Sequence, residues 1–234
     1  MKFRDLRAEE IECRVQSVKE NGVILLLYKD ARCDMNILDE ELGAENWQRE
    51  HYECKGNLFC RVGIKCHNEW VWKADCGTES NTEAQKGEAS DSFKRACFNW
   101  GIGRELYTSP FIWISASDCN IKKSTFNGKD FYSCSDKFVV ESVTIDNKKI
   151  TGITIKNAKT QNIVFELKPE EKPSKMHIEA LLETAKKKGV TTEQILERYK
   201  VENLEDMTFT QYNACAKALN KMLDKVTDPI METP

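Results

Sequence analysis

Residues 69–107 read EWVWKADCGTESNTEAQKGEASDSFKRACFNWGIGRELY, and this stretch decides the fold of the first half of the chain. Side chains in residues 69–76 alternate in character, which is the period of a half-buried strand. The apolar face carries Trp70, Trp72, Ala74 and Cys76. Gly77 ends the alternation. The stretch therefore opens with a strand whose tryptophans we expect to face the core.

A long amphipathic helix follows the glycine. Its apolar stripe repeats at helical spacing and consists of Ala89, Phe93, Ala96, Cys97 and Trp100. Ser80, with Glu83 three residues later, is a candidate N-cap, and Gly101 ends the helix. Lys94 and Arg95 point roughly 110–150° away from the centre of the stripe. This layout is typical of nucleic-acid binding, although an ordinary solvated helix face would look the same.

The region before the helix is rich in strand signals. Strands at 11–19 and 23–28 meet at an Asn-Gly turn, and a helix capped by Asp30 and ended by Gly43 follows them. Three further strands are expected at 47–54, 58–66 and 69–76. Together with the long helix they give the order β-β-β-α. In the middle strand Arg61 and Lys65 lie opposite the apolar residues, and we expect them to project together with Lys73.

The remaining residues predict further strands and then a small helical module. After a polar segment at 115–130, short alternating runs up to residue 167 predict a β-hairpin or meander. Residues 168–174 form a polar, proline-bearing linker. Three amphipathic helices are expected within 175–234. We therefore expect an α+β protein with a core and oligomerisation domain at 1–167 and a helical protein-interaction module at its end.

Composition restricts the partners and the compartment. The formal net charge of the 234 residues is −3, so a polyanion would have to meet cations gathered on one local surface. No apolar run approaches the ~18 residues of a membrane-spanning helix, and the start of the chain lacks the hydrophobic core of an export signal. We expect a soluble, cytoplasmic protein whose ten cysteines are thiols.

Four segments resemble the Rad52 family of single-strand annealing proteins, and most closely its bacteriophage members of the Sak type. They are CRVQS at 13–17, MNILDEELGAENWQ at 35–48, WKADCG at 72–77 and KGEASDSFKRACFNWGIGRELY at 86–107. They occur in the family's order and at compatible spacings. The similarity extends over about residues 1–115.

The resemblance implies an ATP-independent protein of homologous recombination and repair. Such proteins assemble into ring-like or helical homo-oligomers and hold single-stranded DNA by its backbone in a basic groove while complementary strands pair. No catalytic residue, cofactor or metal is implied. The family's DNA-contacting cations fall on Arg14, Lys86, Lys94 and Arg95. Where some relatives carry a third cation, this chain has Phe98, for which Arg61, Lys65, Lys73 or Arg104 would have to compensate.

By the same analogy, the C-terminal helices would dock a host single-stranded-DNA-binding protein or a phage exonuclease.

Other kinds of site stay open on the sequence alone. Cysteines and a histidine crowd residues 54–76, but no C-x-x-C pair is present and the spacing disfavours structural zinc. A Mg²⁺-dependent nuclease would use Asp75, Glu79 and Glu83, although acids at a helix start are also favoured by the helix dipole. A purely structural oligomer without a DNA role is the third alternative.

Overall fold

The computed structural model describes residues 2–78 and 84–223. The chain divides into two compact units, Met1–Lys168 and Pro169–Pro234, and the division falls at the start of the proline-bearing segment 168–174. Each unit has a hydrophobic core of its own. The fold is α+β, as the sequence predicted.

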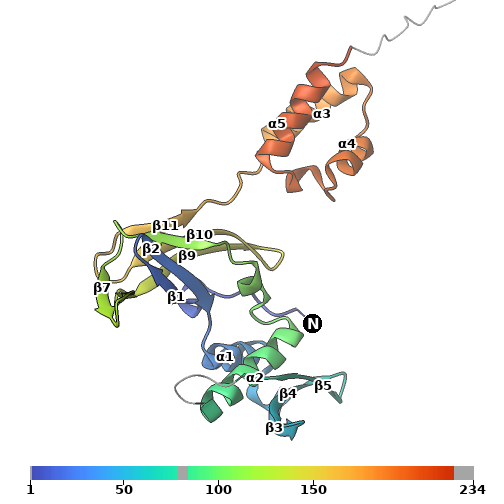
Figure 1. Ribbon diagram of the computed structural model, residues 1–234. Coiled ribbons are helices and arrows are strands. Elements are labelled where there is room, and N and C mark those ends of the chain that lie inside the picture. The colour runs from blue at the N-terminus through green and yellow to red at the C-terminus, as the bar shows by residue number, and fades with distance from the viewer. Residues whose placement is uncertain (1, 79–83, 224–234) are drawn as a thin grey trace, which may run out of the picture. The chain divides into compact units, whose positions relative to one another are not determined.

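The described residues of the first unit form two larger antiparallel sheets, a separate hairpin and two α-helices (Figure 1). In spatial order, the six-stranded sheet consists of β11 (Ile163–Leu167), β10 (Lys149–Asn157), β9 (Phe138–Asp146), β1 (Glu12–Lys19), β2 (Gly22–Tyr28) and β6 (Ile112–Ser115). The three-stranded sheet consists of β3 (Trp47–Cys54), β4 (Asn57–Cys66) and β5 (Glu69–Cys76), and the hairpin of β7 (Ile121–Phe126) and β8 (Lys129–Cys134). The helices are α1 (Ala31–Leu42) and α2 (Ala84–Trp100), with short 3-10 turns η1 (Ala8–Glu10), η2 (Ala44–Asn46) and η3 (Arg104–Thr108).

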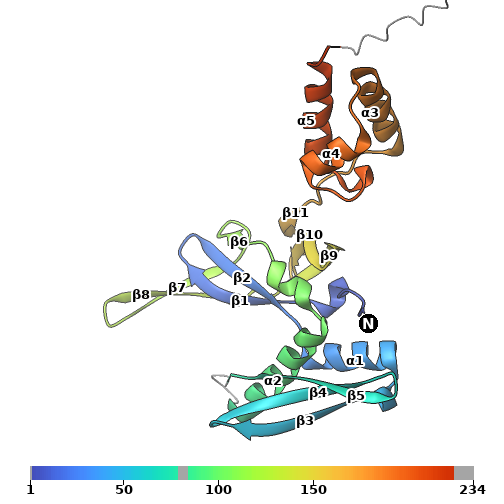
Figure 2. The ribbon, with the colours of Figure 1, turned by 90° about the vertical axis from the view of Figure 1, so that its right-hand side faces the viewer.

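The order β3-β4-β5-α2 confirms the predicted β-β-β-α arrangement. Both α1 and α2 lie on the same side of the three-stranded sheet, between it and the six-stranded sheet (Figure 2). Phe93, Ala96 and Cys97 of α2 are fully buried in the core that joins these layers, together with Val62 and Ile64 of β4. The apolar stripe of the long helix is therefore where the sequence placed it. The expected cap at Ser80 and Glu83 lies outside the described residues.

Strand β5 presents the opposite face from the one expected. The register pairs Val62 with Lys73 and Arg61 with Ala74. Since Val62 is buried and partners across two antiparallel strands point to the same face, Lys73 lies on the helix-covered face. Trp70 lies on the open face and is 40% exposed. The prediction that Lys73 projects together with Arg61 and Lys65 is wrong, because pairing with β4, not apolar content, sets the face.

The hairpin or meander expected after residue 115 is present, but its strands do not form a single sheet. Strands β9–β11 extend the sheet that β1 and β2 begin, through pairing of Glu12 with Val139. Strand β7 begins at Ile121, within the segment 115–130 that the sequence marked only as polar. It pairs with β8 alone.

The second unit is a small helical module. It contains α3 (Lys175–Lys188), α4 (Thr192–Tyr199) and α5 (Phe209–Asn220), with the 3-10 turn η4 (Leu204–Asp206) before the last helix. The hydroxyls of Ser174, Thr191 and Thr208 each accept a backbone N–H of the first helical turn. Leu181 and Met207 are among the most buried side chains of this unit. The three predicted helices are confirmed.

Candidate nucleic-acid interface

Helix α2 carries the paired cations and is held firmly against the three-stranded sheet. A Cβ atom added to Gly77 would collide with the carbonyl oxygen of Glu88 and lie 2.7 Å from the backbone nitrogen of Ser92. Glycine therefore lets the end of β5 touch the helix backbone. Thr78 adds a backbone N–H that donates to the carboxylate of Asp91 at 3.1 Å. The cations of α2 thus project from a rigid support.

Lys94 lies on the side of α2 that faces the junction between β2 and α1. It is half-buried, and its charge acts on Asp30, the N-cap of α1, and on Asp34. Hydrogen bonds from Arg32 are the main reason that the pKa of Asp30 is lowered, and Lys94 adds to this effect. Burial raises the pKa of Asp34 to about 6, against the opposing charges of Lys29 and Lys94.

Arg14 approaches the same junction from the six-stranded sheet. It is exposed on β1, opposite Leu26 of β2. The hydrogen bond to Glu12 is the main cause that raises the pKa of Tyr28 to about 12, and the charge of Arg14 acts in the opposite direction. The charge of Arg14, from β1, thus acts on Tyr28 at the end of β2, and that of Lys94, from α2, acts on Asp30 at the start of α1. Both predicted residues therefore lie within electrostatic reach of the β2–α1 junction.

Arg95 points to the other side of the helix. Its guanidinium Nε lies 3.3 Å from the Asp75 carboxylate of β5, and the side chain is 44% exposed. Successive helical residues diverge by about 100°, which explains why the neighbours Lys94 and Arg95 meet different elements. The ion pair holds Arg95 at the helix surface, where exposed pairs of this kind are weak and exchangeable.

Lys86 is exposed near the beginning of the described part of α2. It precedes Lys94 by eight residues, which corresponds to about 12 Å along the helix axis and a rotation of about 80°. Lys86 therefore lies nearer the Lys94 side of α2 than the Arg95 side.

Two other predicted cations, Lys73 and Arg104, bind the C-terminal end of α2. Lys73 donates to the carbonyl oxygen of Asn99 at 3.0 Å and lies 4.4 Å from the Trp100 ring centroid. Arg104 donates to the carbonyl oxygens of Phe98 and Asn99 at 2.9 and 3.0 Å. A helix end leaves carbonyls without intrahelical partners and carries partial negative charge, so both side chains are well placed as caps.

Phe98, at the position where some relatives carry a cation, packs against Tyr107 with ring centroids 4.4 Å apart. The Arg104 guanidinium lies 5.5 Å from the Phe98 ring centroid. Positive charge is thus present beside Phe98, although it comes from a side chain that also caps the helix.

Arg61 and Lys65 lie on the open face of the three-stranded sheet, away from α2. Arg61 donates to Glu50 at 2.9 Å and sits 4.5 Å from the Trp72 ring centroid. Lys65 is exposed opposite Trp70. These two residues do not join the cations at the β2–α1 junction.

Sequence reasoning missed two features of this junction. Arg32, at the start of α1, is exposed and forms an ion pair with Asp30 at 2.6 Å. Lys29 and Asp34 form an ion pair that is almost completely buried. The position of Arg32 two residues after the N-cap Asp30 was a usable signal, whereas nothing in the local pattern marks Lys29 and Asp34 as buried.

In residues 2–78 and 84–223, no group of three or more His, Cys, Asp or Glu side chains is arranged to hold a metal ion. Asp75 is paired with Arg95, and Glu79 and Glu83 lie outside the described residues. All ten cysteines are free thiols. Within the same part of the chain, no helix is long and apolar enough to cross a membrane.

Comparison with known families decides the kinship of this chain. The sequence model of the Rad52/22 family of double-strand break repair proteins matches residues 4–124, which is more than half of the chain. The chain belongs to the Rad52 family. Neither the curated proteins nor the solved structures contain a match. Rad52-family membership links the chain to DNA recombination and repair by single-strand annealing, and to a family whose members bind single-stranded DNA and oligomerise.

Proposed function

We propose that this protein is an ATP-independent single-strand annealing protein of the bacteriophage Sak type. It binds single-stranded DNA by the backbone and pairs complementary strands in the cytoplasm of the host bacterium. In this proposal it is not an enzyme and needs no cofactor or metal ion. The observation that carries the proposal is the match of residues 4–124 to the Rad52/22 family, a region in which Arg14 of β1 and Lys94 of α2 both lie within electrostatic reach of the β2–α1 junction.

Backbone binding suits the annealing task. Pairing needs free Watson–Crick edges, and sequence-independent affinity comes from neutralised phosphates. The chain as a whole is acidic, with a formal net charge of −3, so the cations must act locally. A ring-like or helical homo-oligomer would repeat the patch of each subunit into a continuous track. Neutralised backbones repel each other less, so two strands concentrated on such a track can approach and pair.

The proposed DNA-binding residues have different weights. Arg14, Lys86 and Lys94 form the main contact surface, to which Arg32 adds a further cation. Arg95 joins when DNA replaces Asp75 as its partner. Arg104 supplies charge beside Phe98 in addition to capping α2, whereas Lys73 acts as a cap alone. Arg61 and Lys65 face away and lie outside this surface.

A salt titration of oligonucleotide binding, combined with the native mass of the free protein, tests the proposal. We expect an oligomer whose affinity for single-stranded oligonucleotides falls steeply with salt, without nucleotide or metal. An oligomer that shows no salt-sensitive binding would instead be purely structural. Magnesium-dependent loss of the labelled oligonucleotide that Asp75→Ala abolishes would indicate a nuclease.

We also propose that the C-terminal unit docks a protein of the recombination system, either the host single-stranded-DNA-binding protein or a phage exonuclease. Its separate hydrophobic core supports an independent module. Deleting residues 172–234 should leave annealing intact and abolish co-purification with these proteins. Loss of annealing in the truncated protein would contradict this division of labour.

A further inference from the structure

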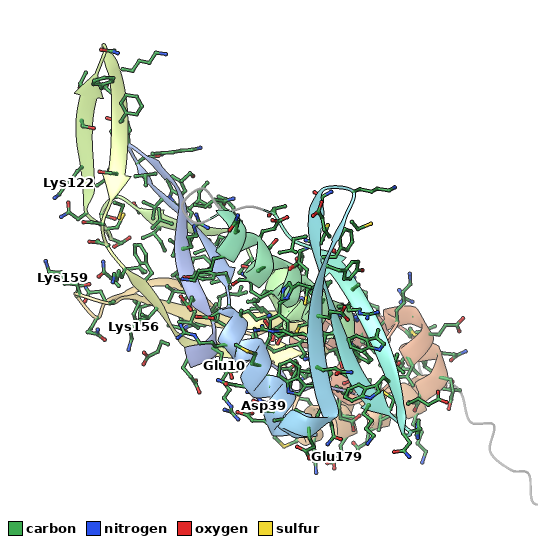
Figure 3. The ribbon with its side chains drawn as sticks, turned by 90° about the horizontal axis from the view of Figure 1, so that it is seen from below. Glu10, Asp39, Lys122, Lys156, Lys159 and Glu179 are labelled. Carbon is green, nitrogen blue, oxygen red and sulfur yellow. The ribbon has the colours of Figure 1, made fainter. Side chains whose placement is uncertain are left out.

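The β7–β8 hairpin projects from the first unit as a separate two-stranded ribbon, as the views agree (Figures 1 and 2). The strands turn at Asn127 and Gly128, which both have positive φ angles, as a tight hairpin turn requires. At its root, Ile121 and Cys134 pack against the main core. Lys122 lies on this ribbon, away from helix α1 (Figure 3). The family match ends at residue 124, inside β7, so most of the hairpin lies beyond it.

One face of the hairpin satisfies its own charges. Lys123 forms an ion pair with Asp130 at 2.8 Å, and Thr125 donates to the same carboxylate at 2.8 Å. The Lys123 ammonium also lies 6.0 Å from the Tyr132 ring centroid. Together with Ile121 and Cys134, these residues make up the face that continues from the core. We call it the paired face.

The other face carries cations and aromatic rings without any acid. Its residues, by strand alternation and register, are Lys122, Ser124, Phe126, Lys129, Phe131 and Ser133. Phe126 is 69% exposed and Phe131 is 51% exposed. Within the described part of the chain, the side chains of Lys122 and Lys129 have no hydrogen bond, ion pair or ring contact. We call this the open face.

From its root to its tip, the open face presents Lys122, then Phe131, and then Phe126 side by side with Lys129. Lys129 stands directly opposite Phe126, Phe131 is the diagonal neighbour of Phe126, and Lys122 stands opposite Ser133 beyond it. Lys122 and Phe126 are four residues apart on one strand, which corresponds to about 13 Å. Ser124 lies opposite Phe131, and both rings are more than half exposed, so each can be approached from solvent.

Single-stranded nucleic acid fits this pattern better than a protein surface does. Proteins that bind single strands combine cations for the backbone with exposed aromatic rings on which bases stack. A strand offers one phosphate for each lysine and one base for each phenylalanine. Packing a protein over this face would bury two ammonium groups for which the face itself supplies no carboxylate. An isolated two-stranded ribbon cannot bury the two phenylalanine rings, so both stay exposed and available to a ligand.

We propose that the open face of the β7–β8 hairpin is a second contact site for single-stranded DNA. Phe126 and Phe131 stack on bases, and Lys122 and Lys129 bind the adjoining phosphates. This inference rests on the proposed DNA-binding function but uses a different chemistry. The junction of Arg14 and Lys94 holds the backbone alone, whereas the hairpin grips a few bases and fixes the strand in place.

The test compares two oligonucleotides of equal length, oligothymidylate and an abasic strand with the same number of phosphates. Phe126→Thr with Phe131→Thr keeps residues suited to strands and should weaken binding of oligothymidylate about tenfold or more, because stacking on both rings is lost. The same variant should bind the abasic strand as tightly as the unaltered protein. Unchanged binding of oligothymidylate, or equal loss on both strands, overturns the inference.

Adjacent lysines provide a matched control for the charge. Lys122→Gln with Lys129→Gln should lower the slope of log affinity against log salt by about 1.4, since each phosphate contact to a single strand contributes about 0.7. Lys123→Gln, on the paired face of the same strand, should leave the slope unchanged. Equal effects of Lys122→Gln and Lys123→Gln would mean that the hairpin acts only as diffuse charge.

Native mass separates the remaining outcomes. If the phenylalanine variant changes the oligomer instead of DNA affinity, the open face contacts a second copy of the chain and the inference fails. If binding depends on Lys94 and Arg95 but not on the hairpin, the proposed function stands and only this inference fails. Absence of any binding by the unaltered protein would remove both.

Discussion

Replacing Lys94 and Arg95 together by alanine tests the cations of α2 quantitatively. Each phosphate neutralised on a single strand contributes about 0.7 to the slope of log affinity against log salt, so two lost contacts lower the slope by about 1.4. Between about 50 mM and about 200 mM salt, the affinity advantage of the unaltered protein should therefore shrink about sevenfold. Arg95 is already held 3.3 Å from Asp75, so this slope change is the upper limit.

Fluorescence anisotropy of a labelled oligonucleotide, measured at several salt concentrations, provides the slopes. Circular dichroism and native mass should remain those of the unaltered protein, because both side chains are at the helix surface and neither belongs to the core. Asp75→Asn is the matched variant, for which the opposite change in affinity is expected. It frees Arg95 from its partner and should tighten binding and raise the slope. An unchanged slope in the double variant, or weaker binding by Asp75→Asn, would refute the assignment of Lys94 and Arg95 to the DNA surface.

Three further predictions concern the support of this surface. Asp34→Ala leaves the Lys29 ammonium buried without its partner and should lower the free energy of unfolding in urea by about 3–5 kcal/mol. Lys29→Met with Asp34→Leu should restore most of that loss. A fully stable Asp34→Ala variant would contradict the buried pair. Gly77→Ala should cost about 1–3 kcal/mol, because its Cβ has no room against α2, and a neutral result would show that the contact is looser. Lys73→Met should cost about 1 kcal/mol through loss of the helix cap without changing the salt slope, and a lowered slope would return Lys73 to the DNA surface.

The local sequence was sufficient for the helices and strands up to residue 103. Asp30 and Gly43 mark the ends of α1, and the buried Phe93, Ala96 and Cys97 lie on the predicted stripe of α2. These elements are set by turns, caps and short periodicities, which are properties of neighbouring residues.

Features set by contacts between distant residues could not be predicted. The face of β5 depends on its register with β4, and both faces of the strand carry aromatic or aliphatic side chains, so apolar content misled the prediction for Trp70 and Lys73. Strand β7 has no buried face beyond Ile121, and therefore lacks the alternation by which strands are recognised.

The candidate site likewise combines residues that the sequence could assign with an arrangement that depends on contacts between distant residues. Arg14 and Lys94 were assigned from the family resemblance, but only the fold brings both within electrostatic reach of one junction. The roles of Lys73 and Arg104 as caps depend on carbonyl groups of α2 that the sequence does not reveal as their partners.

Annealing itself is the most direct test of the central claim. Two complementary oligonucleotides carrying a donor and an acceptor dye are mixed without ATP or metal ion, and the rate of energy transfer is followed with and without protein. We predict that the unaltered protein accelerates pairing and that Arg14→Gln with Lys94→Gln, at equal native mass, abolishes most of the acceleration. Acceleration by this variant equal to that of the unaltered protein would contradict the account.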